Sequence, residues 1–234
     1  MSEPIVSVIL PIMILNDEQK EMTDRCIQTL RDTTNVPYEL ILVEAKSHLY
    51  EEYTNLPEGN LLKVEKYLHF PEPIGCSKEF NQGIDVSSGD FIIHIGNDIF
   101  TQPGWLEALL DCFKIEDCGI ATLASSDLQM KPIDKIMEGV WCPLMMWRKG
   151  WRFDEDFPNV FCDSDLVMRH YEVGFRMYRN WNIVVEHLSA VTSKARWTKE
   201  EDINRFNKWK SVFVERHKNS HLIIYRILTE GWIC

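Results

Sequence analysis

Short apolar runs alternate with amphipathic segments through the first half of the chain. Residues 5–12 (IVSVILPI) and 38–44 (YELILVE) are continuous apolar runs of strand length, as found in strands buried on both faces. A weaker strand is predicted over 61–68, and another over 90–96 (DFIIHIG). These runs predict a mostly parallel, buried sheet.

The segment after the first strand has the signals of a helix. Asn16 is a typical N-cap, and Gln19 follows it at the spacing of a capping box. Met22, Cys26 and Leu30 then repeat every four residues, which places them on one helix face. We expect this face to pack on the sheet.

Further elements continue the alternation. Helices are predicted over about 76–87, from Pro103 onward and over about 163–173, with a strand over 175–187 and a helical region over about 198–228. Strands that alternate with helices predict an α/β fold, a doubly wound sheet flanked by helices. No linker divides the chain, so residues 1–234 are expected to form a single domain.

Two acids follow predicted strands on the same side of this sheet. Glu44 ends the second strand, and Asp98 follows the strand over 90–96. Ligands of open α/β sheets bind beyond the carboxyl ends of the strands. The sequence therefore predicts a binding site that includes both acids.

Composition narrows the functional class. The chain of 234 residues is 45% hydrophobic and 26% charged, as in globular proteins, and no apolar run approaches about 20 residues. The first 15 residues lack a basic segment and contain Pro4 and Pro11, which argues against a signal peptide. A cytoplasmic location is expected.

Cysteine spacing suggests no metal cluster or disulfide framework. The seven cysteines are odd in number, and no two are separated by only two residues. Buried free thiols are the expectation.

The net charge of −11 argues against broad nucleic-acid binding. Residues 194–218 nevertheless hold eight basic residues against four acids. This segment is interpreted either as a solvated helix face or as a contact for an anionic acceptor.

Four motifs together resemble the family 2 glycosyltransferases, which have the GT-A fold. In chain order they are VSVILPI with YELILVEAKS, IGCSKEFNQGIDVSSGDFIIHIGNDIF, WRFDEDFPNVFCDSDLVMRHYEVGF, and IVVEHLS with RFNKWK. They extend over about residues 4–210. The resemblance implies a nucleotide-sugar-binding half over about 1–100, an acceptor and catalytic half over about 101–195, and a helical extension over about 196–234.

The resemblance implies a divalent cation, Mn²⁺ or Mg²⁺, at Asp98. The matching stretch is Gly96-Asn97-Asp98, so the first acid of the family's metal motif is missing. His187 is expected near the cation, and Asn97 is expected to orient water or ribose. An Asn-Asp pair after a strand is also a common turn.

Asp163 is the residue that the resemblance implies as general base. An inverting transfer needs a carboxylate that removes the acceptor proton. Asp163 and Asp165 both stand at a predicted helix start, where aspartate is also a common N-cap, so one could cap the helix while the other acts as the base; the match to the motif favours Asp163 as the base.

The resemblance also implies a donor pocket. Its expected residues are Pro11, Ile12, Glu44 and Ser47 around the base, and Gly75, Lys78, Asn81 and Asn97 along the remainder of the donor. A UDP-sugar is the expected donor. Glutamate replaces the family's usual aspartate at position 44, so another base stays open.

Aromatic residues suggest an acceptor surface. Trp147 and Trp151 stand among basic residues, an exposed context in which rings stack on sugars, and Asp165 is expected beside them. Trp141 is expected in the core. His94 is expected to be buried and paired.

Three functions are compatible with these features. The first is an inverting, metal-dependent glycosyltransferase that acts on a hydroxyl acceptor: a glycan, protein, lipid carrier or modified nucleobase. The second is a degenerate GT-A domain that binds a nucleotide or glycan without catalysis. A nucleotidyltransferase ranks last, because no glycine-rich loop follows the first strand. The apolar C-terminal segment HLIIYRILTEGWIC is expected to cover a partner or form a homodimer.

Overall fold

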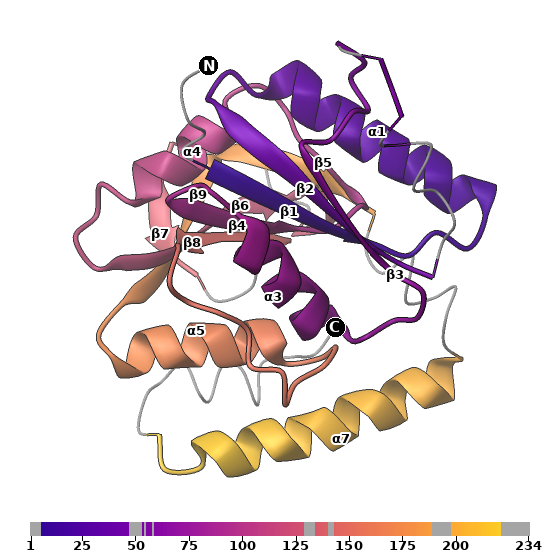
Figure 1. The fold of residues 1–234 in the computed structure, drawn as a ribbon. Coiled ribbons are helices and arrows are strands. Elements are labelled where there is room, and N and C mark those ends of the chain that lie inside the picture. Colours follow the sequence, from indigo (N-terminus) through magenta and orange to yellow (C-terminus); the bar gives the residue numbers. More distant parts are fainter. Residues whose placement is uncertain are drawn as a thin grey trace.

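The computed structural model describes residues 6–46, 53, 55–57, 59–128, 134–139, 143–188 and 198–220. It is an α/β structure in which helices cover both faces of a nine-stranded sheet (Figure 1). The expected fold class is confirmed.

The strands of this sheet are β1 (Val6–Ile12), β2 (Tyr38–Ala45), β3 (Lys66–Phe70), β4 (Phe91–Ile95), β5 (Ile99–Phe100), β6 (Cys118–Ser125), β7 (Ile136–Glu138), β8 (Leu144–Arg148) and β9 (Arg176–His187). The helices are α1 (Asp17–Thr33), α3 (Cys76–Val86), α4 (Trp105–Cys112), α5 (Cys162–Glu172) and α7 (Lys199–His217), with a 3₁₀ turn η1 (Ser126–Leu128).

The sheet has a parallel part and a mixed part. The order is β3-β2-β1-β4-β8-β6-β9-β5, with β7 paired to β9. Strands β1 to β4 run parallel, whereas β8 lies antiparallel between β4 and β6. The carboxyl ends of β1, β2 and β4 therefore meet at one edge, as the sequence predicts.

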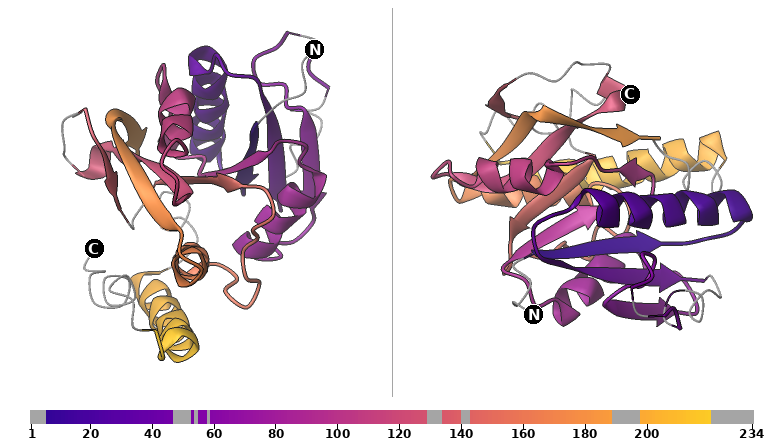
Figure 2. Two further views of the ribbon diagram at one scale, coloured as in Figure 1. Left: turned by 90° about the vertical axis from the view of Figure 1, so that its left-hand side faces the viewer. Right: turned by 90° about the horizontal axis from the view of Figure 1, so that it is seen from above.

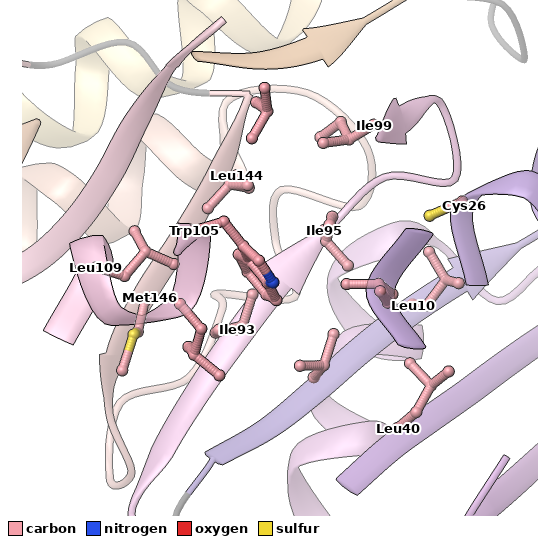
Figure 3. Close-up of a cluster of buried hydrophobic side chains, with 14 of the residues drawn as sticks. Leu10, Cys26, Leu40, Ile93, Ile95, Ile99, Trp105, Leu109, Leu144 and Met146 are labelled. Atoms are coloured by element: carbon pink, nitrogen blue, oxygen red, sulfur yellow. The ribbon is translucent and has the colours of Figure 1, made fainter. Parts of the chain in front are cut away.

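Alternate strand residues build two hydrophobic cores, one on each face. Leu10 and Ile93 pack with α1 and α4, and Figure 3 shows this core with Trp105 among the strand residues. Ile9 and Ile92 point the other way, toward α3, α5 and α7. Figure 2 shows α1 and α4 on one side of the sheet, and α5 beside α7 on the other.

The predicted first helix is confirmed. Asn16 Oδ1 accepts a hydrogen bond from Gln19 N at 2.9 Å, and Met22, Cys26 and Leu30 are buried. Gln19 Oε1 accepts from the N–H of the residue before the cap, Leu15, at 2.7 Å.

Several boundaries differ from the prediction. The third strand begins at Lys66, not 61, and the helix after Pro103 begins at Trp105, because Gly104 adopts a left-handed conformation just before it. Strands β6 and β8 were not predicted. The last helix ends at His217; 221–228 lie outside the described residues, as does the proposed dimer segment.

The described cysteines are free thiols. Cys26, Cys112, Cys118 and Cys162 are buried and Cys76 is partly buried. This confirms free thiols for these five residues and burial for four of them; Cys142 and Cys234 lie outside the described residues. Within the described part of the chain, no helix is both long and apolar enough to cross a bilayer.

Candidate active site

Asp98 and His187 meet at the edge of the sheet where β4 ends. Asp98 lies in the turn between β4 and β5, and β5 pairs antiparallel with the end of β9, with Ile99 opposite His187. This register places Asp98 Oδ2 3.6 Å from His187 Nε2. Leu188 N donates to Asp98 O at 3.0 Å and ties the two segments together.

The other ring nitrogen of His187 faces a second carboxylate. Nδ1 of His187 lies 3.0 Å from Oδ2 of Asp127 in η1, and the His187 N–H donates to Ser126 Oγ at 3.0 Å. Burial alone lowers the pKa of His187, but Asp98 and Asp127 reverse this and raise it above 6.5. Sequence reasoning missed Asp127, whose only signal is its place just after a strand.

The chemistry of this pair fits a divalent cation. Carboxylate oxygen and imidazole nitrogen are both ligands of Mn²⁺. In the described part of the chain, no three acidic, histidine or cysteine side chains are placed to hold an ion by themselves. Asp98 and His187 therefore offer two groups of ligand type at this edge of the sheet.

Asp163 lines a cavity of about 300 Å³ near the start of α5. Phe161, with φ of 67°, turns the chain into this helix, and Ser164 N donates to Asp163 Oδ1 at 2.7 Å. Burial raises the pKa of Asp163. The cavity is lined by Cys76, His94, Asn159, Val160, Phe161, Cys162, Asp163, Ser164 and Phe206.

His94 lies on β4, the strand that leads into the turn with Asp98. Its ring lines the cavity, and burial lowers its pKa to about 3 while the nearby Asp98 charge acts in the opposite direction. The expectation that His94 is paired is wrong: Nδ1 is buried and receives no hydrogen bond from any part of the chain that the structure describes.

The N-terminus of α3 lies under a loop of the second half. Gly75 caps the helix with φ of 99°, and a Cβ there would lie 3.1 Å from Pro158 Cβ. Cys76 N donates to Asn159 Oδ1 at 3.3 Å, and Ser77 N to Pro158 O at 3.2 Å. Gly75 thus permits this close approach, and Lys78 projects from the same turn into solvent.

Asn81 does not face a donor pocket. Phe153 N donates to Asn81 Oδ1 at 3.1 Å, and Asn81 Nδ2 donates to Phe153 O at 3.0 Å and to Glu155 Oε1 at 3.0 Å. Its side chain is buried and used to hold the chain after β8 against α3. The donor-binding prediction for Asn81 is corrected.

Asn97 is also turned away from the site. Its Nδ2 donates to Thr23 Oγ1 of α1 at 2.9 Å, and the residue is buried. In place of the predicted contact with water or ribose, the side chain ties the turn between β4 and β5 to α1.

Glu44 is fully buried at the end of β2. Its Oε2 accepts from Tyr67 Oη at 3.2 Å and contacts His69 Nδ1 on β3. Because this carboxylate is fully buried and already paired within the chain, the prediction that Glu44 contacts the base is corrected. Of the other base-pocket residues, Ile12 is buried and Pro11 partly buried, and Ser47 lies outside the described residues.

The predicted acceptor residues are mostly internal. Trp147 is fully buried and its Nε1 donates to Trp151 O at 3.1 Å, so its predicted exposure is wrong. Asp165 is fully buried and accepts from Arg169 Nε at 2.7 Å, with His217 Nε2 3.1 Å away. Trp151 is partly buried. Trp141, expected in the core, lies outside the described residues.

Solved structures with similar folds are glycosyltransferases. S. aureus TarS 1–349 with UDP-GlcNAc has 13% identity and a TM-score of 0.65 over 97% of this chain and 70% of that one. The mannosyltransferase PcManGT from Pyrobaculum calidifontis, with GDP-Man and Mn²⁺, has 13% identity and a TM-score of 0.63 over 97% and 68%. The chain spans 66% of another TarS 1–349 structure and 40% of a longer TarS chain.

Sequence comparison gives the family directly. No curated protein matches the chain. The model of Glycosyl transferase family 2 matches residues 7–137, which is more than half of the chain. The chain therefore belongs to glycosyl transferase family 2 and has the GT-A fold.

Proposed function

We propose that the chain is an inverting, metal-dependent glycosyltransferase, with Asp163 as general base and Asp98 and His187 as cation ligands. One observation carries the proposal: the cavity lined by Asp163 is also lined by His94 of β4, the strand that ends just before the turn with Asp98. A donor sugar in this cavity would have the cation pair on one side and a carboxylate on the other.

Asp163 suits the role of base for two reasons. Burial raises its pKa, which makes the carboxylate a stronger base than a solvated one. The Ser164 N–H and hydroxyl both reach Oδ1, so they fix the orientation of the carboxyl group. Oδ2 would take the proton of the acceptor hydroxyl as the sugar is transferred.

Asp98 and His187 would hold the cation, which when bound stabilises the charge of the departing diphosphate. Asp127 fixes the ring of His187 through Nδ1 and leaves Nε2 directed toward Asp98. A carboxylate behind a metal-bound histidine is a common arrangement, since it sets the tautomer and raises the basicity of the ligand.

The donor would be a nucleotide sugar. TarS binds UDP-GlcNAc and PcManGT binds GDP-Man with Mn²⁺, so UDP- and GDP-sugars are the first to test. Gly75, Lys78, Pro11, Ile12 and Ser47 remain proposed donor contacts. Lys78 is solvent-exposed in the first turn of α3, where a cation could meet phosphate. The acceptor class stays open, and Trp151 remains the proposed acceptor contact.

A screen of nucleotide sugars with and without Mn²⁺, measured as donor hydrolysis, tests the activity. We expect Mn²⁺-dependent hydrolysis of at least one donor. Asp163→Asn should lower the rate of transfer about 10²-fold or more while donor affinity survives. A rate within a few-fold of wild type would contradict the assignment of the base.

The degenerate GT-A domain is the second candidate, and one observation favours it. Gly96 stands where the family has its first acid, and a Cβ at Gly96 would lie 2.7 Å from Asp98 Oδ1. The Asp98 carboxylate therefore occupies the space that a side chain at position 96 would need. With glycine at position 96, Asp98 is the single acid of the motif. Binding of a nucleotide sugar with neither transfer nor slow hydrolysis would favour this candidate.

A further inference from the structure

The cavity beside Asp163 contains a polar group that the proposed chemistry does not use. His94 stands in the middle of β4, where its neighbours Ile93 and Ile95 are core residues. Its side chain points to the opposite face of the sheet, toward α3 and α5. There the ring lies edge-on to Phe80, with centroids 3.9 Å apart, and to Phe153 at 5.6 Å.

Packing fixes the position of this ring but leaves its hydrogen-bonding capacity unused. Nδ1 is enclosed by the protein and has no hydrogen-bond partner within the described residues, so a ligand in the cavity would reach the ring through its other nitrogen, Nε2. A buried polar atom without a partner costs free energy, so such atoms are few in folded proteins and call for an explanation. An aliphatic residue or phenylalanine at position 94 would fill the same space without this cost.

The surroundings of His94 favour an uncharged ligand group. Burial keeps the imidazole neutral, so the ring offers one N–H donor and one acceptor. The cavity wall is mostly apolar, with the aromatic rings of Phe161 and Phe206 5.1 Å apart. Neutral hydrogen-bonding groups among aromatic rings are suited to a sugar, whose C–H faces are apolar and whose edges are hydroxyls.

The size of the cavity points to the same part of the donor. About 300 Å³ is at the lower end of the range for ligand pockets, roughly 300–1,000 Å³. This is suited to a monosaccharide unit rather than to a whole nucleotide sugar. Asp163 on the same wall would then lie beside the sugar that is transferred.

We propose that His94 is a specificity-determining residue that hydrogen-bonds a hydroxyl of the donor's sugar in the cavity shared with Asp163. This inference rests on the proposed function and assigns one contact within it. His94 selects among sugars of the same nucleotide by rejecting those that lack the hydroxyl, because Nε2 would then be left without a partner in the closed site.

His94→Phe is the test variant, because it keeps the ring that packs on Phe80 and Phe153 and removes both nitrogens. Dissociation constants are measured by calorimetry with Mn²⁺ for UDP-GlcNAc against UDP, and for GDP-mannose against GDP. The variant should bind the nucleotide sugar about three- to tenfold more weakly than wild type, whereas its affinity for the nucleoside diphosphate should stay within twofold. His94→Gln, which restores a neutral donor and acceptor, should recover part of the loss.

His170→Phe is the matched control. His170 is also buried, with a pKa lowered to about 4 by burial, but its Nδ1 bonds Leu166 O at 2.8 Å and it does not line the cavity. Its ratio of nucleotide-sugar to nucleotide affinity should equal that of wild type. Thermal unfolding of each variant, compared with wild type, separates lost contacts from lost folding.

Each outcome decides the inference. If His94→Phe weakens UDP and UDP-GlcNAc equally, or changes neither, His94 does not contact the sugar and the inference fails while the proposed function stands. If a deoxygenated donor loses affinity in wild type but not in His94→Phe, the contacted hydroxyl is identified. If wild type binds no nucleotide sugar of a broad panel, the proposed function fails and the inference fails with it.

Discussion

Nε2 of His187 lies 3.6 Å from Oδ2 of Asp98, although one residue ends β9 and the other follows β4. The short antiparallel pairing of β5 with β9 brings them together. Asp127 contacts the opposite nitrogen of the same ring. A histidine between two carboxylates is thereby held in one orientation at the edge where nucleotide ligands of α/β sheets bind.

Asp127→Asn should weaken Mn²⁺ binding about 10- to 100-fold, as is typical when a residue that orients a metal ligand is lost. His187→Ala should have at least this effect. The dissociation constant of Mn²⁺ in the presence of UDP is measured by electron paramagnetic resonance of the free ion. Asp90→Asn, at an exposed acid just before β4, is the control. Equal Mn²⁺ affinity in all variants would exclude His187 as a ligand.

Asp163→Asn should lower kcat/KM about 10²- to 10⁴-fold, because the general base is lost. Donor affinity should stay within twofold. Since burial raises the pKa of Asp163, the rate of wild type should fall as the pH drops through this raised pKa, at a higher pH than for a solvated aspartate. A pH–rate profile at saturating donor measures this limb.

Asp163→Asn should raise the stability of the fold although it lowers activity, which provides a second check. A carboxyl group whose folded pKa is raised destabilises the fold when ionised, and this loss develops as the pH rises from the unfolded to the folded pKa. The asparagine variant should therefore have a higher Tm than wild type at pH 7. A lower Tm would show that Asp163 has a structural role instead.

Asp165→Ala should destabilise the fold by about 3 kcal/mol, because it leaves buried partners without their anion. Asp165 is fully buried and contacts Arg169 of α5 and His217 of α7, so it joins the two helices. Urea unfolding measures the loss. Asp111→Ala is the control, since its ion pair with Lys114 is exposed and is expected to contribute about 0.5 kcal/mol or less.

His217 should make this attachment of α7 pH-dependent. Burial alone lowers its pKa, but Asp165 and Glu172 outweigh this and raise it, while Arg169 and Arg216 pair with Asp165 from α5 and α7. Because the pKa of His217 is raised in the folded state, its ion pairs contribute fully to the free energy of unfolding below pH 6.5. This contribution is lost as the pH rises through the pKa of the folded state.

The free energy of unfolding, measured between pH 6.5 and 9, should therefore fall more in wild type than in His217→Gln. This range avoids His94 and His170, whose lowered pKa values affect stability below pH 6.5. If the free energy of unfolding changed with pH equally in the two proteins, the role of His217 would be contradicted.

Gly83→Ala should destabilise the fold by about 1–3 kcal/mol through overpacking. A Cβ at Gly83 would lie 2.6 Å from Ile9 Cγ2, where α3 crosses β1. Gln82→Ala on the same helix is the control and should change the free energy of unfolding by less than about 0.5 kcal/mol. Equal effects of the two substitutions would mean that α3 can move away from the sheet without cost.

Local signals predicted the parallel half of the fold well. The apolar runs of β1 and β2 and the Asn16 cap of α1 are each contained in a few consecutive residues. The insertion of β8 between β4 and β6 depends on pairing between distant segments, and no local pattern encodes it. For this reason Trp147 of β8 was expected at the surface but lies in the core.

The candidate site was only partly predictable for the same reason. Asp98 and Asp163 follow from motif order, and the cavity and the cation pair support both proposals. The use of Asn81 and Asn97 as internal ties depends on partners in Phe153 and Thr23, which are remote in sequence. The unpaired nitrogen of His94 became visible only when its surroundings were known.

The most direct test of the central claim is the anomalous signal of manganese in a crystal soaked with Mn²⁺ and a nucleotide sugar that binds in solution. We expect a peak within ligand distance of both Asp98 Oδ2 and His187 Nε2, with Asp163 facing the anomeric carbon from across the sugar. A peak bound by other residues, or an Asp163 carboxylate directed away from the sugar, would contradict it.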